Sequence, residues 1–540
     1  MRSAGSLLRG GVHLGSGTVA SRVLGFLRTV LLAWILGAVG SEAADAFAVA
    51  NQLPNNVYWL ISSGVFAAIL VPQVVRSHTH PDGGEAHINR VLTLGLSLLA
   101  VTTVVALLLA PWLVRIYTAS WGSAQLELAV AFAVWCLPQI LFYGVFSLLG
   151  EVLNARRQFA PAAWAPLINN VISLAGLGTF AIIFGVFPDG TGNVGDWTPL
   201  MVALLAGTTT LGVAGQAGVL VVAWRRARLR FRPDFRWREV HLSGMPQIAG
   251  WTFAIVVLGQ VLGIVQSRVT ALASGAGASL FATSTAWLLF MLPYSVVAVS
   301  ITTVYFTRLS ELGASGNTHE FVQLITSGTR MLVIAMTGAT LAMLLVSVPI
   351  GRVLTEGRDS VQAMSMVLAA YLVGLVPFAL LLLVQRAFYA VGDARTPFIY
   401  ACVQAVVLVT ATLLVPLLVR PEMIAAGVAL AQSIGTTVQA TAGYLLLRRK
   451  LGPLALRSLM HTAARVAVAT LPASALGGTL GIWLVGPSLE GWAMTNQLTA
   501  AATAVLIATT FAATYLTMLW LVKDPTLQEL ITRFTPPRTR

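Results

Sequence analysis

Long apolar runs separated by short polar segments recur along the whole chain. The runs over 91–114 and 498–522 are each long enough to cross the roughly 30 Å hydrocarbon layer of a membrane as an α-helix. The pattern predicts fourteen such helices. Their expected ranges are 15–38, 46–74, 91–114, 127–150, 161–187, 198–223, 246–271, 279–305, 328–350, 362–386, 398–419, 423–447, 463–486 and 496–522.

The composition agrees with this pattern. Hydrophobic residues make up 57% of the 540 residues and charged residues only 10%, whereas a soluble domain is typically about 25% charged. No polar segment exceeds the length of a loop, so no separate soluble domain is expected. We therefore predict an all-α polytopic membrane protein.

The net charge of +14 is distributed unevenly between the two sets of loops. One set holds most of the arginines, including the cluster over 225–238, and the opposite loops hold only Arg115, Arg352, Arg358 and Arg420. Positive loops favour the cytoplasmic side, so both termini are expected in the cytoplasm. The basic surplus is thus mainly a topology signal. It does not indicate nucleic acid, although part of it can hold anionic membrane lipid.

Two stretches with the same layout indicate an internal repeat. Residues 151–168 and 386–403 each contain a helix end, a short basic loop and a proline that begins the next helix, Pro161 and Pro397 respectively. The offset is roughly 235 residues and six spans. Because six is even, the two halves share one orientation, which predicts a parallel pseudo-two-fold relation.

The repeat predicts four parts. These are an N-terminal lobe of six helices over 1–224, a basic cytoplasmic linker over 225–243, a C-terminal lobe of six helices over 244–450, and a helix pair with a cytoplasmic tail over 451–540. Two six-helix lobes favour an alternating-access transporter with a cavity between the lobes.

The first predicted helix carries two arginines inside its apolar run. An arginine near the centre of a spanning helix costs about 2.5 to 3.5 kcal/mol on insertion scales, so its presence needs a reason. At 100° per residue, Ser21, Arg22, Gly25 and Arg28 fall within one arc of about 120°. Gly25 lies midway between the two arginines, and we expect open space beside it.

Two interpretations of this polar stripe stay open. In the structural one, Arg22 extends to the cytoplasmic interface and Arg28 pairs with a buried acid, for which Asp45 is the candidate. In the functional one, the stripe lines a wet cavity that binds an anion, and arginine suits phosphate because its planar fork donates two parallel hydrogen bonds. Arg268, near the outer end of the seventh span, allows the same two interpretations.

The second predicted helix has a row of polar residues. Asp45, Gln52 and Asn56 lie along nearly one line of the helix surface. Such a row in a membrane needs polar neighbours or water, so it indicates either a cavity lining or an interhelical hydrogen-bond seam.

Signals for an enzyme are weak. The chain has no phosphate-cradling glycine loop and no spacing of metal ligands or of a nucleophile and a base. Its two cysteines, Cys136 and Cys402, lie inside apolar runs. We expect no enzyme activity, no metal and no cofactor, and we expect transport to be driven by an ion gradient or the membrane potential.

Several motifs carry a family resemblance. "SRVLGFLRTVLLAWILGA" (21–38), "LNARRQFAPAAWAPLINN" (153–170), "FMLPYSVVAVSI" (290–301) and "RAFYAVGDARTPF" (386–398) resemble the MurJ/MviN family of the multidrug/oligosaccharidyl-lipid/polysaccharide exporter superfamily. The resemblance implies a flippase that moves lipid II, the undecaprenyl-diphosphate-linked peptidoglycan precursor, from the inner to the outer leaflet of the bacterial inner membrane. It also implies that cell-wall synthesis and division proteins are partners.

The resemblance implies site residues as well. Family arginines that contact the diphosphate match Arg22 and Arg28, an acid early in the second helix matches Asp45, and a groove at helices 13 and 14 is implied for the lipid tail. The chain departs from the family at Tyr58 and near Leu288, where many members carry arginine. These departures leave two alternatives open: a related lipid-linked polysaccharide or drug exporter, and a non-transporting cell-wall scaffold.

Overall fold

The computed structural model describes residues 20–63, 85–118, 120–156, 158–187, 194–229, 231–236, 246–452 and 456–523. In these ranges every regular element is a helix, and twelve helical segments are long and apolar enough to cross a membrane. Each of the twelve coincides with one of the predicted spans from the third to the fourteenth. The all-α polytopic fold is therefore confirmed, while the number fourteen stays a prediction.

The first two predicted spans extend beyond the described ranges. Residues 20–36 are helical, and α2 follows as Glu42–Ile61. The predicted ends at 15–19 and 64–74 lie outside the described residues.

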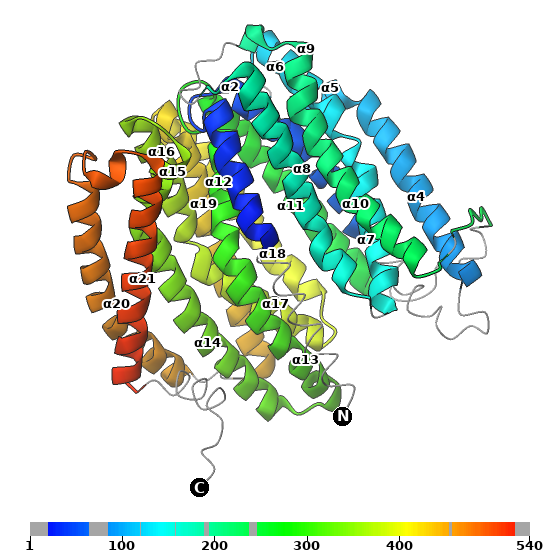
Figure 1. The fold of residues 1–540 in the computed structure, drawn as a ribbon. Coiled ribbons are helices and arrows are strands. Elements are labelled where there is room, and N and C mark those ends of the chain that lie inside the picture. The colour runs from blue at the N-terminus through cyan, green and yellow to red at the C-terminus, as the bar shows by residue number, and fades with distance from the viewer. Residues whose placement is uncertain are drawn as a thin grey trace. The chain divides into compact units, whose positions relative to one another are not determined.

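The chain divides into two compact units, residues 1–275 and 276–540 (Figure 1). The first unit holds helix 20–36 and α2. Its further helices are α4 (Glu85–Leu108), α5 (Ala110–Tyr117), α6 (Ser123–Cys136), α7 (Gln139–Ala155), α8 (Ala160–Phe184), α9 (Pro199–Val202), α10 (Thr208–Arg226) and α11 (Pro246–Thr270). This unit ends after α11, one long helix beyond the predicted lobe of residues 1–224, and the predicted domain boundaries stay predictions.

The second unit contains the remaining helices. They are α12 (Leu280–Pro293), α13 (Val299–Ser315), α14 (Thr318–Leu345), α15 (Ser347–Leu354), α16 (Arg358–Leu372), α17 (Leu375–Ala390), α18 (Arg395–Leu418), α19 (Ile424–Leu451), α20 (Leu456–Val485) and α21 (Gln497–Leu521). In Figure 1, α20 and α21 lie side by side, and both also contact α14.

Within the described ranges, four predicted spans are interrupted by helix breaks, among them 127–150 between α6 and α7 and 362–386 between α16 and α17. The span expected over 91–114 is divided at Leu109, where α4 ends and α5 begins with a proline in its first turn. The span expected over 328–350 is divided between α14 and α15. In the first case the reason is chemical, because Pro111 has no backbone N–H to donate to the preceding turn. Apolar character continues through the breaks at Leu109 and Val346, so the hydrophobic pattern alone does not reveal them.

Helices α8 and α10 pack with very little space between their backbones. A methyl group added at Gly176 would overlap the side chain of Thr208, and one added at Gly212 would overlap Asn169. Small residues at such crossings let helix backbones approach closely, and van der Waals contact and hydrogen bonds then hold the pair. Here Asn169 Nδ2 also donates to Gln216 Oε1 at 3.2 Å. The two helices are therefore interlocked along their length.

The basic segment after α10 is bound to the first turns of α4. The Asp234 carboxylate accepts from Arg90 Nε at 2.9 Å, the Asp234 backbone N–H donates to Thr93 Oγ1 at 3.0 Å, and the Arg232 N–H donates to Asn89 Oδ1 at 3.3 Å. Arg236 binds the same carboxylate at 2.9 Å. Residues 231–236 therefore form an anchored segment of the predicted linker.

We predict that Asp234→Asn weakens this anchor. The arginines Arg236 and Arg90 hydrogen-bond to the Asp234 carboxylate and hold its pKa below the usual range. A depressed pKa contributes stability above the unfolded value of about 3.9, and that contribution is lost only as the pH falls through the lower folded value. Hydrogen exchange of residues 231–236 should therefore stay slow from pH 5 to 8 in the unmodified protein and become faster in Asp234→Asn.

Arg236→Gln is the matched control for this prediction. Arg236 is 67% exposed, whereas Arg90 is 18% exposed, so the exposed contact should add little to the anchor. If exchange becomes equally fast in Arg236→Gln and Asp234→Asn, the anchor does not depend on the contacts to α4.

Candidate functional site

The arginines of helix 20–36 have no acidic partner in the part of the chain that the structure describes. Arg22 and Arg28 are both half-buried, and neither takes part in any of the ion pairs found in the described ranges. The Nε of Arg22 is buried and donates to no acceptor within those ranges. The guanidinium groups of Arg22 and Arg28 therefore have N–H donors that a ligand can use.

Asn170 of α8 contacts this polar face directly. Its Nδ2 donates to the Ser21 carbonyl at 2.8 Å and to Ser21 Oγ at 3.3 Å. A methyl group added at Gly25 would lie 3.7 Å from the same nitrogen. The open space expected beside Gly25 is therefore occupied by an amide, because a buried asparagine side chain needs polar partners and finds them on helix 20–36.

Arg28 lies near a second polar chain that starts at Tyr143 of α7. The Arg28 charge and the Tyr143 phenol are close enough to interact electrostatically. Tyr143 donates to Gln139 Oε1 at 3.0 Å, and Gln139, which is fully buried, donates to Thr210 Oγ1 at 3.0 Å. Thr210 in turn donates to the Trp135 carbonyl at 2.7 Å. These hydrogen bonds fix the position of the Tyr143 phenol.

Asp45 belongs to a different cluster. It lies in the first turn of α2, is 3% exposed, and accepts a hydrogen bond from Ser274 Oγ at 2.7 Å. Gln125 of α6 donates to the same Ser274 hydroxyl at 2.8 Å and to the Glu42 carbonyl at 3.1 Å. No ion pair between Asp45 and Arg28 is found in the described ranges. Asp45 instead ties α2 to the segment after α11.

The other predicted site residues lie in mixed surroundings. Gln52 is exposed, and Asn56 donates to the Tyr117 hydroxyl of α5 at 3.0 Å. Asn56 thus takes part in an interhelical seam, one of the two interpretations of the polar row. Arg268 is exposed in the last turn of α11. No contact in the described ranges joins it to Arg22 or Arg28.

Sequence reasoning missed two contributors to this site. Neither Asn170 nor Tyr143 with Gln139 is among the site residues predicted from the sequence. The signal for Asn170 is a pair of adjacent amides, Asn169 and Asn170, inside an apolar run. Adjacent helix positions point in different directions, so one amide binds α10 and the other binds helix 20–36.

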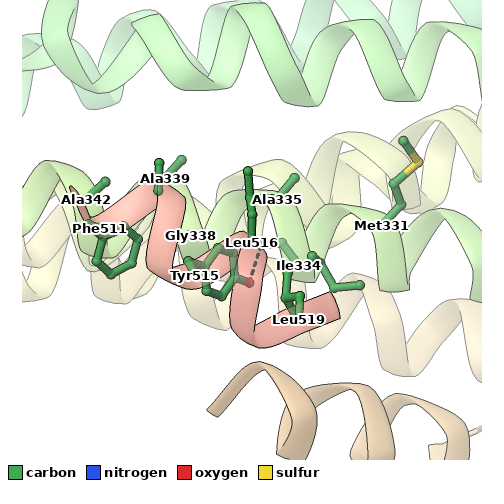
Figure 2. A pocket seen from close by; sticks show the side chains of 11 residues that line it. Met331, Ile334, Ala335, Gly338, Ala339, Ala342, Phe511, Tyr515, Leu516 and Leu519 are labelled. Carbon is green, nitrogen blue, oxygen red and sulfur yellow. Dashed lines mark hydrogen bonds between the residues drawn. The ribbon is translucent and has the colours of Figure 1, made fainter. Parts of the chain in front are cut away.

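An apolar groove is present in the second unit, between α14 and α21 (Figure 2). Its volume is about 330 Å³, and it is lined by Met331, Ile334, Ala335, Gly338, Ala339, Ala342, Phe511, Ala512, Tyr515, Leu516 and Leu519. The Tyr515 hydroxyl is not free in the groove, because it donates to the Ile334 carbonyl at 2.9 Å. The groove can therefore accept a hydrocarbon chain without leaving a polar group unsatisfied.

Comparison with known proteins decides the family. The family model described as lipid II flippase MurJ matches residues 32–523 of the chain. The chain belongs to the MurJ lipid II flippase family. The probable lipid II flippase MurJ of Rhizobium tropici is 27% identical over 462 residues, which cover 82% of this chain and 81% of that protein. The probable lipid II flippase MurJ of Vibrio cholerae is 25% identical and covers 74% of this chain.

Solved structures agree on the fold of this MurJ family member. A structure of lipid II flippase MurJ in an inward closed conformation matches with a TM-score of 0.70 and 18% identity, covering 94% of this chain and 99% of that one. An inward-facing multidrug resistance MATE family transporter of the MOP superfamily matches with a TM-score of 0.60 and 15% identity over 80% of this chain. The family resemblance drawn from the sequence motifs is thus confirmed, and the family is one of transporters.

We predict that Asn170→Ala lowers lipid II transport several-fold and raises the substrate concentration needed for half-maximal transport. The substitution removes both hydrogen bonds to Ser21, and a typical bond of this kind contributes about 0.5 to 1.5 kcal/mol. The measurement is lipid II transport by the purified protein in vesicles at varied lipid II content.

Asn169→Ala is the matched control. It removes the bond to Gln216 on α10 and leaves helix 20–36 untouched. If Asn170 has only a structural role, Asn170→Ala and Asn169→Ala should behave alike. Both would then lower the melting temperature and leave the lipid II concentration for half-maximal transport unchanged.

Proposed function

We propose that this chain moves lipid II from the inner to the outer leaflet of the bacterial inner membrane by alternating access. Family membership supports this function, because the matching relatives are named as lipid II flippases. The observation that carries the assignment to residues is the pair Arg22 and Arg28. Both are retained in a membrane helix without an acidic partner in the described ranges.

The chemistry of the substrate fits these cations. A diphosphate and its sugars cannot enter hydrocarbon without replacing their water, and a guanidinium supplies paired charge-assisted hydrogen bonds to phosphate oxygens. We assign Arg22 and Arg28 to the diphosphate, with Ser21 and Gly25 on the same helix face. Asn170 holds that face in place through Ser21. Gln52, Asn56 and Arg268 are assigned to the polar groups of the substrate, and Asp45 to the support of α2.

The hydrocarbon tail of the substrate needs a different surface. We assign it to the groove between α14 and α21, whose lining side chains are apolar (Figure 2). This places the tail beside the last helix of the predicted C-terminal pair, in keeping with the groove that the family resemblance implies at helices 13 and 14.

The proposed topology has fourteen spans, with both termini in the cytoplasm. Transport uses an ion gradient or the membrane potential and no bound cofactor. One charge moved across 100 mV provides about 2.3 kcal/mol, comparable to a typical coupling energy between two conformations. Cell-wall synthesis and division proteins are the proposed partners.

A non-transporting scaffold is the second candidate, and one observation favours it. Tyr58 stands where many family members carry arginine, and its ring lies 5.9 Å from that of Tyr143, centre to centre. An aromatic pair therefore stands where many family members carry a cation. Leu288 of α12, at the other departure from the family, is half-buried and apolar.

Complementation tests the proposed function. The unmodified chain is expressed in bacteria depleted of their own lipid II flippase, and lipid II exposed on the outer leaflet is measured directly. A flippase restores both growth and exposure. A scaffold restores neither, and a drug exporter restores neither but increases drug efflux.

A further inference from the structure

A second cleft lies in the first unit, where α8 begins and α10 ends. It has a volume of about 720 Å³ and is lined by residues of these two helices, by Gln158, which precedes α8, and by Ala227, which follows α10. The predicted topology puts this end of both helices at the cytoplasmic interface. Neither the diphosphate site nor the apolar groove uses any of these residues.

The body of the cleft is apolar. Gly218, Val222 and Arg226 are spaced four residues apart, so they lie on one face of α10. From Gly218 to Arg226 the helix rises by about 12 Å. A methyl group added at Gly218 would meet nothing within 4 Å, so this face is open. Trp164 of α8 forms the other wall and is 38% exposed. Tryptophan at one turn from a helix end is typical of the membrane interface.

The rim of the cleft is cationic. Arg226 is exposed and lines the cleft, and its neighbours Arg225 and Arg228 are exposed as well. None of the described residues that line the cleft is an acid. An apolar body next to a cationic rim requires a ligand with a hydrocarbon part and an anionic head. A soluble phosphate would leave the apolar part empty, and a zwitterionic headgroup would place a second positive charge near Arg226.

We propose that this cleft binds an anionic phospholipid of the inner leaflet, with its phosphate at Arg226 and an acyl chain along Gly218 and Val222. The lipid then fills the space between the ends of α8 and α10 and packs against Trp164. Binding at this cleft is a property of the membrane environment and does not depend on whether the chain transports lipid II.

Native mass spectrometry of the full-length chain in detergent tests this site. The probes are phosphatidylglycerol and, as the zwitterionic comparison, phosphatidylcholine. We expect a tighter first adduct with phosphatidylglycerol. Arg226→Gln should weaken that adduct roughly fivefold, the effect of one arginine near an anionic lipid. Gly218→Leu, which places a side chain in the open face, should also weaken it.

Arg225→Gln is the matched control, because it removes the same charge from the adjacent residue, which does not line the cleft. It should leave the first adduct unchanged. If Arg225→Gln and Arg226→Gln weaken the phosphatidylglycerol adduct equally, the binding comes from general surface charge and the proposal is overturned. Equal binding of phosphatidylglycerol and phosphatidylcholine would also overturn it. If Gly218→Leu lowers the melting temperature, Val222→Trp provides the second blocking variant. Complementation of flippase-depleted cells does not enter this test.

Discussion

Replacing Arg28 with alanine is expected to reduce lipid II transport at least tenfold while the protein remains in the membrane. A hydrogen bond to a charged group contributes about 1.5 to 3 kcal/mol, which corresponds to about 10- to 150-fold in affinity. Insertion should not suffer, because an arginine near the helix centre opposes insertion and alanine does not. The measurements are outer-leaflet lipid II in flippase-depleted cells and the amount of protein in the membrane fraction.

Two control variants separate charge from packing. Arg28→Lys keeps the charge but loses the paired hydrogen bonds, so it should retain part of the activity. Thr29→Ala changes the next residue, whose hydroxyl donates only within the helix, to the Gly25 carbonyl at 3.0 Å. It should transport normally. Normal growth of depleted cells on Arg28→Ala would remove Arg28 from the substrate site.

Filling the groove between α14 and α21 is expected to reduce transport about tenfold. Ala512 lines the groove and is exposed, so Ala512→Phe places an aromatic ring where we assign the hydrocarbon tail of lipid II. Each methylene kept out of an apolar site loses about 0.8 kcal/mol, so excluding two of them accounts for an effect of this size. The measurement is transport in vesicles, with lipid II binding measured in parallel.

The adjacent residue provides the matched control. Ala513 is also exposed on α21 but does not line the groove. Ala513→Phe should therefore transport at the unmodified rate. If both variants transport alike, whether normally or poorly, the groove is not the site of the tail.

The sequence predicted most of the fold because a single physical rule decides it. A membrane-spanning segment has to be apolar and about twenty residues long, so the runs from 91–114 to 496–522 were recognisable one by one. The breaks inside such runs were not recognisable. Leu109 and Val346 interrupt helices within apolar sequence, and an apolar residue fits a helix and a break equally well.

The candidate site was predictable only in part. A charged residue inside an apolar run is easy to recognise in a sequence, so Arg22 and Arg28 were identified as site candidates. Asn170 and Tyr143 did not, because their importance comes from contacts with helix 20–36 that are more than a hundred residues away along the chain. Asp45 was a candidate partner for Arg28 by its charge alone, and the hydrogen bond that its carboxylate accepts from the Ser274 hydroxyl could not be read from the sequence.

The close fit of α8 and α10 limits how the protein can move. A methyl group at Gly176 or Gly212 would already overlap the facing helix, so neither helix can slide or roll against the other without breaking that contact. Any rearrangement during transport has to carry them as one rigid body, and Asn170 travels with that body. A cysteine cross-link between α8 and α10 should thus leave transport turnover unchanged. A cross-link between α8 and helix 20–36 should stop turnover if the helix that carries Arg22 and Arg28 moves relative to α8 during transport.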